Sequence, residues 1–177
     1  MSGRIFYLQP FNSSDPVPPI TITSIVSRLN KELKISYKIQ GDLEKIILPS
    51  ANDTVKRQDN LWQTTCFEFF LAIFHSRKYW EFNIAPTGDW NVYYFTEYRR
   101  GMRTATAFTQ LPFEVKRNNS TYELTTQINI DTISRDTFLE TAVTTVIGDT
   151  NHNLSYWAIT HPGTQADFHR RDSFVTI

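Results

Sequence analysis

Two glutamates lie in the most apolar part of the chain, and their carboxyl groups and spacing could serve ligand binding or acid–base catalysis. Glu68 stands alone in CFEFFLAIF (residues 66–74), and Glu81 and Asn83 follow in KYWEFNIA (residues 78–85). A carboxylate in so apolar a strand needs a partner or a ligand to offset its desolvation. If all three side chains share one side of two neighbouring strands, their Cβ atoms lie roughly 5 Å apart. Such a group of oxygens suits the hydroxyl groups of a sugar.

Glu68 has two other interpretations. It could be the buried partner of an arginine such as Arg99 or Arg100, because paired buried charges are a common structural solution. It could also form a catalytic pair with Glu81, since retaining glycosidases use two carboxyl groups about 5 Å apart. The sequence carries no nucleophile motif, phosphate-binding glycine loop or HExxH-type metal site beside this pair. We therefore expect no catalytic residue and a protein that is not an enzyme.

Aromatic residues near these carboxylates could supply flat surfaces for a sugar ring. An indole or phenol ring lies against the C–H side of a pyranose and loses little rotamer freedom on binding. Core packing is the alternative, and we expect it for Trp80, whose neighbours at the strand period are apolar. His161 either contacts a ligand or hydrogen-bonds a loop carbonyl. The predicted ligand-binding residues are Trp62, Glu68, Glu81, Asn83, Trp90, Tyr94, Arg99, Trp157 and His161.

Short strands with a two-residue period must position these side chains. Alternation puts Glu68 with Cys66 and Phe70 on one side of its strand, and Phe67 and Phe69 on the other, core side. Residues 49–60 are polar and predict a long surface loop, and residues 131–142 favour one short helix. The tail HRRD (residues 169–172) either closes over a pocket mouth or is a solvated charge run. Further strands are predicted at residues 4–9, 20–29, 33–39, 44–49, 89–98, 113–117, 121–130, 141–149 and 154–161.

About nine or ten short strands separated by turn signals indicate an all-β fold, an antiparallel β-sandwich of the jelly-roll type. No internal repeat or linker divides the chain, so we expect a single domain over residues 1–177. The terminal segment at residues 162–177 is expected to add at most an edge strand.

Composition excludes several classes of partner. The 18 basic and 18 acidic residues leave no net field that would attract nucleic acid or an anionic membrane. The single cysteine, Cys66, cannot form an internal disulfide or a CxxC metal site. The N-terminus lacks the apolar region of a signal peptide, and no apolar run is as long as a membrane span. We expect a cytoplasmic protein with no cofactor and no metal, and the oligomeric state stays open.

Three segments resemble a known family. TCFEFFLA with YWEFNIAPTGDWNVYYFTEYRRGM, then SYWAITHPG, and finally DFHRRDSF are similar to the DOMON-like domains related to family 9 carbohydrate-binding modules. The match spans most of residues 61–174. The resemblance implies a β-sandwich whose concave face holds a sugar or a haem without catalysis. For haem, the methionine and histidine ligands of such domains would require Met102 and His161 to converge.

These observations predict a non-catalytic module that binds a saccharide or a sugar-containing metabolite on one face of a sheet. The alternatives are a haem-binding DOMON domain and a protein–protein interaction module, which would present a flat apolar patch in place of a cleft lined with polar groups. A glycosidase is the least favoured.

Overall fold

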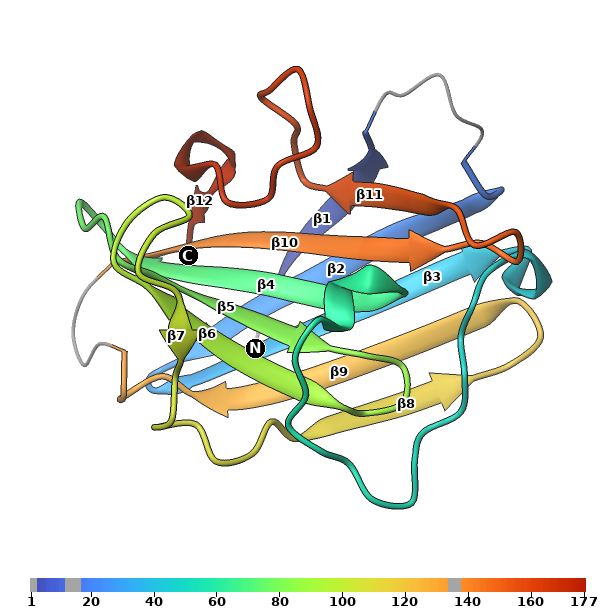
Figure 1. The fold of residues 1–177 in the computed structure, drawn as a ribbon, viewed down its shortest axis with the longest axis horizontal. Coiled ribbons are helices and arrows are strands. Elements are labelled where there is room, and N and C mark those ends of the chain that lie inside the picture. The colour runs from blue at the N-terminus through green and yellow to red at the C-terminus, as the bar shows by residue number, and fades with distance from the viewer. Residues whose placement is uncertain (1–2, 12–16, 134–137) are drawn as a thin grey trace.

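The computed structural model describes residues 3–11, 17–133 and 138–177, which form twelve β-strands and three short 3₁₀ turns, with no α-helix among them (Figure 1). Every pair of strands is antiparallel, so the all-β, antiparallel prediction is confirmed. The described part of the chain has no helix of the length and apolar character that a membrane crossing requires.

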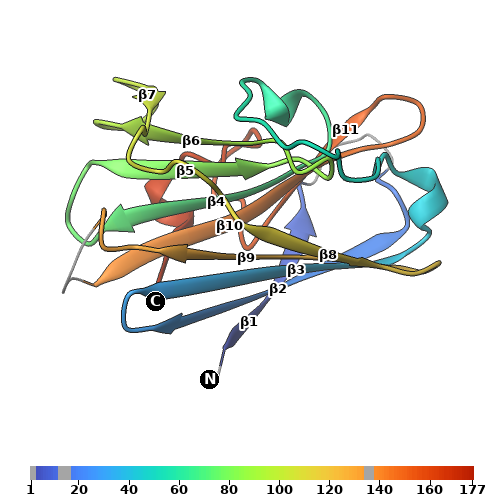
Figure 2. The ribbon, with the colours of Figure 1, turned by 90° about the horizontal axis from the view of Figure 1, so that it is seen from below.

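The strands form two layers that face each other (Figure 2). The first sheet contains, in spatial order, β1 (Arg4–Pro10), β2 (Ile20–Leu29), β3 (Glu32–Gly41), β9 (Thr121–Asn129) and β8 (Phe113–Arg117). The second sheet contains β7 (Arg103–Thr104), β6 (Trp90–Phe95), β5 (Tyr79–Ile84), β4 (Cys66–Ile73), β10 (Leu139–Gly148) and β11 (Leu154–Ala158), and β12 (Val175–Thr176) pairs with β10. Because β1 pairs with both β2 and β11, the two sheets are continuous along this strand.

The main core lies between the two layers. Phe67, Phe69 and Leu71 of β4 are fully buried there, as the alternation of their strand predicts. Phe69 stacks on Phe82 of β5 with ring centroids 4.4 Å apart. From the first sheet, Tyr37 donates a hydrogen bond of 2.5 Å to the backbone carbonyl of Glu68, which joins the two layers at the strand that carries the candidate chemistry.

The opposite side of the second sheet, here called the outer face, is also partly covered. Phe70, Tyr79, Tyr93 and Phe95 are buried on it and form a second, smaller apolar cluster. The residues that pack onto this cluster come from two distant segments: Trp62 from the 3₁₀ turn Leu61–Gln63, and Phe168 and Phe174 from the chain that follows β11. The outer face is therefore a sheet surface roofed in places by loops.

Two predicted elements differ from the structure. The helix predicted at residues 131–142 is wrong over residues 139–142, which belong to β10, while residues 134–137 lie outside the described part. β10 is rich in β-branched residues and buried on both faces, so its apolar positions mimic helical spacing over the first turn. Residues 44–49 form the end of a 3₁₀ turn and one isolated bridge at Ile46, because Leu43, Ile46 and Leu48 reach the core without a ladder.

Candidate functional site

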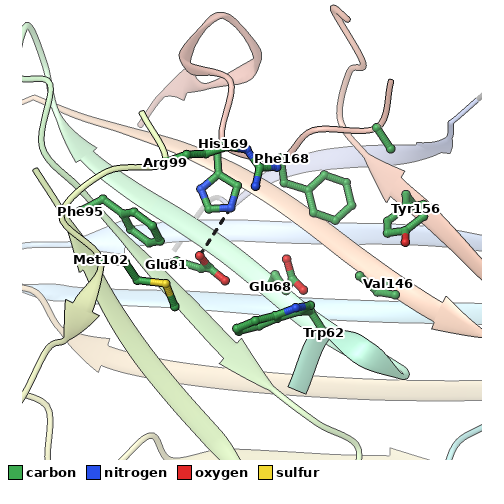
Figure 3. Close-up of a pocket in the computed structure, with 11 residues that line it drawn as sticks. Trp62, Glu68, Glu81, Phe95, Arg99, Met102, Val146, Tyr156, Phe168 and His169 are labelled. Carbon is green, nitrogen blue, oxygen red and sulfur yellow. Dashed lines mark ion pairs between the residues drawn. The ribbon is translucent and has the colours of Figure 1, made fainter. Parts of the chain in front are cut away.

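A cavity of ≈ 300 Å³ opens on the outer face of the second sheet (Figure 3). Strands β4, β5, β6, β10 and β11 supply its floor, and the turn after β6 and the segment after β11 supply its rim. Its lining residues are Trp62, Glu68, Glu81, Phe95, Arg99, Met102, Val146, Tyr156, Ala166, Phe168 and His169.

Strand register brings the two glutamates together. Glu68 on β4 lies directly opposite Asn83 on β5, and the next pair on the same face joins Phe70 to Glu81. Glu68 and Glu81 are therefore diagonal neighbours on one face, as the alternation of both strands predicts. In the view of Figure 3 their carboxyl groups lie side by side, with Trp62 below and His169 above.

Glu68 is 3% exposed, and its Oε1 has no hydrogen-bond partner among the described residues. Neither of the expected arginines reaches it: Arg99 pairs with Asp167 (Nη2 to Oδ1, 2.8 Å) and Arg100 with Glu97 (3.5 Å). Burial, and next the charge of Glu81, raise the pKa of Glu68 well above its ordinary value. Both effects favour the neutral carboxylic acid form of Glu68 over its ionised form.

Glu81 is held by one amide and faces one imidazole. Asn83 donates Nδ2–H to Glu81 Oε1 at 2.8 Å, and Nε2 of His169 lies 3.8 Å from Oε2. Burial raises the pKa of Glu81 to about 7, and the hydrogen bond from Asn83 and the charge of Arg99 act in the opposite direction. Asn83 thus positions Glu81 from within the sheet.

His169 is fixed by a chain of hydrogen bonds. The backbone N–H of Arg99, which has a left-handed φ of 52°, donates to Tyr79 Oη at 3.1 Å, and Tyr79 Oη lies 2.8 Å from His169 Nδ1. We assign the tautomer in which Tyr79 donates its proton to Nδ1 and the histidine carries its own proton on Nε2, toward Glu81. Phe70 and Phe95 meet the imidazole ring edge to face at 5.3 and 5.1 Å.

The contact between His169 and Glu81 is not an ion pair. Burial, and next the charge of Arg99, lower the pKa of His169 to about 4, while the pKa of Glu81 is about 7. Between these two values both groups are neutral. The histidine can donate a hydrogen bond into the pocket, and Glu81 can either donate or accept one.

The rim is held in place by Asp167. Its Oδ1 accepts hydrogen bonds from Arg99 Nη2 (2.8 Å) and from the backbone N–H of His169 (3.1 Å), and its Oδ2 accepts one from Tyr98. Burial alone would raise the pKa of Asp167, but these donors hold it below its ordinary value. The guanidinium group of Arg99 is therefore already paired with the carboxylate of Asp167.

Of the predicted residues, four line the cavity, and Asn83 supports one of them. These four are Trp62, Glu68, Glu81 and Arg99. Trp62 is partly exposed and meets Tyr93 edge to face at 5.8 Å.

The other four predicted residues lie elsewhere. Trp90 is 5% exposed on the core side, with the guanidinium of Arg57 4.1 Å from its ring. Tyr94 packs against the main core, and Trp157 is buried in it. His161 is 2.9 Å from the carbonyl of Gln9, which matches its alternative interpretation.

Strand alternation explains these placements. Trp90, Tyr94 and Trp157 occupy the core-facing positions of β6 and β11, because Trp90 pairs with Ile84 and Trp157 with Thr145. One position away, Tyr156 pairs with Val146 and lies at the cavity. Phe95 shares the side of Tyr79 and Glu81 by the same rule, so the two-residue period and the strand register together put Phe95 and Tyr156 on the outer face.

Phe168 and His169 carry no such signal, because they lie in an irregular segment. The one sequence-based prediction that concerns this segment is that residues 169–172 could close over a pocket. Met102 lines the cavity, but His161 does not, so the two residues that haem ligation would require are not brought together there.

Comparison with known proteins identifies the fold. No protein-family model matches the chain, and no curated protein matches it. Among solved structures, one from Bacteroides uniformis, provisionally assigned as carbohydrate-binding, superposes with a TM-score of 0.71 at 15% identity, over 98% of this chain and 85% of that one.

Two further matches are complexes of a family 9 carbohydrate-binding module from Caldicellulosiruptor kristjanssonii. The complex with cellotriose has a TM-score of 0.56 at 11% identity, over 92% of this chain and 75% of that one. The complex with glucose has a TM-score of 0.53 at 13% identity, over 84% and 71%. At these identities the similarity shows the β-sandwich fold.

Proposed function

We propose that this protein is a non-catalytic module that binds a saccharide in the cavity formed by Trp62, Glu68, Glu81 and His169. The observation that carries the proposal is the buried carboxyl group of Glu68, whose Oε1 has no partner among the described residues although it borders a cavity. A ligand hydroxyl would supply the missing hydrogen bond. A sealed core would have no such use for an acid.

The shape and lining of the cavity match the two-sided character of a sugar ring. Glu68, Glu81 and His169 offer donors and acceptors at one end, while Trp62, Tyr156 and Phe168 offer apolar surfaces for the C–H groups. A volume of ≈ 300 Å³ is at the lower end of the range for small-molecule sites, which suits one sugar residue with its hydration. A haem is much larger, and Met102 and His161 do not converge here.

The electrostatics of the pair support binding without hydrolysis. A retaining glycosidase needs one ionised carboxylate as nucleophile beside one protonated acid. Burial raises the pKa of both Glu68 and Glu81, and no described cation faces Glu68 to ionise it. The similarity of the fold to modules crystallised with cellotriose and glucose supports the same conclusion.

The test is a saccharide screen by calorimetry on the wild type and on Trp62→Ala. We expect the variant to bind about tenfold more weakly or worse, because an aromatic face against a sugar contributes on the order of 1–2 kcal/mol. The matched control is Tyr7→Ala, which removes a ring that is 68% exposed on β1 of the first sheet and should leave affinity unchanged. Equal affinity of Trp62→Ala and wild type would remove this cavity from the function, and a Soret band after incubation with haem would favour the haem alternative.

A further inference from the structure

We infer that the ligand preferred by this pocket carries a protonated amine, so that, given the saccharide-binding function proposed above, its ligand class is amino sugars with a free amino group. The inference depends on an imbalance between the acidic and basic groups that border the cavity.

Two acidic groups border the cavity, Glu68 and Glu81. Glu68 and Glu81 are 3% and 5% exposed. Glu81 accepts a side-chain hydrogen bond from Asn83, and Glu68 interacts with the thiol of Cys66. Glu68 Oε1 is without a partner in the described part of the chain. Buried carboxyl groups of this kind are normally matched by a basic group.

The basic groups that border the cavity already have hydrogen-bonding partners. Arg99 is the one Lys or Arg among the residues that border the cavity, and its Nε and Nη2 both bind Oδ1 of Asp167, at 3.3 and 2.8 Å. Its side chain is 52% exposed, so it lies at the rim. His169, the other nitrogen base, is engaged at Nδ1 by Tyr79 and points a single N–H at Glu81. No permanently charged side chain among the described residues therefore pairs with either acid, although the charge of Arg99 still lowers the pKa of Glu81.

The remaining walls favour a cation as well. Trp62, Phe95, Tyr156 and Phe168 border the same cavity, and the faces of aromatic rings attract ammonium groups. A neutral hydroxyl could hydrogen-bond either acid, but it would not offset the cost of ionising one away from water. An ammonium group would do so, because it pairs with the carboxylate that it creates.

Proton release is the signature of this mode of binding. The titratable groups that act on the two acids are Tyr37 from β3, Cys66 from β4, Tyr79 from β5, Tyr93 from β6, Arg99 from the turn after β6, and His169 with Asp167 behind it from the segment after β11. Burial raises the pKa of Tyr37 and of Tyr93, so both stay neutral. Burial raises the pKa of Cys66 and of Tyr79, the latter to about 12, so both stay neutral. An incoming ammonium would therefore displace a proton from Glu68 or Glu81.

The experiment is calorimetry at about pH 6, below the pKa of about 7 of Glu81, with three probes: D-glucosamine, D-glucose and N-acetyl-D-glucosamine. We expect glucosamine to bind at least about tenfold more tightly than the other two, since it alone carries a charge. Titrations in two buffers of different ionisation enthalpy should show that glucosamine releases a proton and glucose does not. Glucose binding as tightly as glucosamine would overturn the amine inference and leave the saccharide function intact, whereas no binding of any of the three would overturn the amine inference and count against the function as well.

Two variants separate the acids from general effects of mutation. Glu68→Gln and Glu81→Gln keep the side-chain shape but cannot ionise, and each should reduce the ratio of glucosamine affinity to glucose affinity by about tenfold, whatever its effect on glucose binding itself. The matched control is Glu123→Gln, an exposed glutamate on β9 of the first sheet that pairs with Lys38. If both pocket variants keep the full preference for glucosamine, the carboxyl groups do not recognise the amine.

Discussion

Burial raises the pKa of a carboxyl group that no charged base neutralises, and Glu68 and Glu81 are two such groups on one face of the sheet. Their burial carries a free-energy cost for the folded protein whenever the solution pH favours their ionised forms. A stabilising role would have been served better by an apolar residue of similar size. The two glutamates therefore trade stability for a polar site.

The cost at Glu81 has a definite pH window. Its pKa rises from 4.5 in the unfolded chain to about 7 in the fold, so between these values the folded state binds more protons than the unfolded state. Stability from this group is fully present below the lower value and is lost as the pH rises through the upper one. Glu81→Gln should therefore gain up to about 3 kcal/mol relative to wild type at ~pH 8 and little at ~pH 4.5.

Urea denaturation of both proteins at the two pH values measures this difference. His169 has the opposite dependence, because burial lowers its pKa to about 4 and its contribution is lost as the pH falls from 6.5. That dependence is common to wild type and variant, so the comparison removes it and measures the contribution of Glu81 together with its effect on Glu68. The same gain at both pH values would mean that Glu81 is ionised in the fold.

At the residue scale the sequence predicts that the two glutamates and Asn83 share one face of the sheet, but it does not predict which aromatic residues lie beside them. The single charged residue in CFEFFLAIF, Glu68, can be recognised without knowledge of the fold. Alternation on β5 then puts Glu81 on the same face of the sheet. Tryptophan suits a core and a sugar platform equally, so residue type alone does not separate Trp62 from Trp157. Only the register of β11 with β10 decides that Tyr156, and not Trp157, reaches the cavity.

At the scale of elements, the chain after β11 completes the pocket. This segment contributes Ala166, Phe168 and His169 to the cavity, and Asp167 fastens it to the turn after β6. Further along, Arg171 donates to the carbonyl of Ser76 at 2.7 Å, which anchors the same segment to the loop between β4 and β5. Contacts between distant loops therefore define one wall of the site.

Removal of the Asp167 carboxylate should loosen that wall. Asp167→Ala leaves Arg99, Tyr98 and the backbone N–H of His169 without their common acceptor, at a cost on the order of 1.5–3 kcal/mol for hydrogen bonds to a charged group. We expect amide hydrogen exchange to become about tenfold faster or more in residues 166–170, and saccharide affinity to fall.

The control for this prediction is Asp172→Ala. Asp172 pairs with the neighbouring Arg170 at 2.6 Å, with its side chain 54% exposed, so its loss should leave exchange in residues 166–170 unchanged. Unchanged exchange in Asp167→Ala would show that the aromatic contacts of Phe168 and His169 hold the wall by themselves.

Strands are the elements that the sequence predicts best, because a sheet buried on one face produces a regular alternation. The loop at residues 49–60 is also confirmed, although Arg57 and Asp89 tie it closely to the second sheet. The helix predicted at residues 131–142 is wrong over residues 139–142, because the apolar spacing there fits both periods. The position of an irregular segment such as residues 162–174 follows from tertiary contacts, which no local pattern reports.

For the whole molecule, one core shared by two sheets predicts cooperative unfolding. Phe69 is fully buried between the layers and stacks on Phe82. Phe69→Ala should lower the free energy of unfolding by about 3–5 kcal/mol, with near-UV and far-UV circular dichroism changing at the same midpoint. Phe138→Ala, which removes a ring 74% exposed, is the control and should cost little. Separate transitions by the two probes would mean that an intermediate keeps its strands after the core packing is lost, and would contradict cooperative unfolding.

The pairing of β1 with β11 has a consequence for how the protein is made. Gln9 and Ala158 are partners in the sheet although most of the chain separates them. In the same way, β4 pairs with β10, which is synthesised much later. During synthesis, β1 can form its hairpin side with β2 early, but its other edge stays without a partner until β11 leaves the ribosome. A topology with so many non-local contacts folds slowly and exposes strand edges on the way. The nascent chain should therefore depend on chaperones more strongly than the finished protein does. The strand that joins the two sheets, β1, is the one whose free edge most needs protection from wrong pairing before β11 is available.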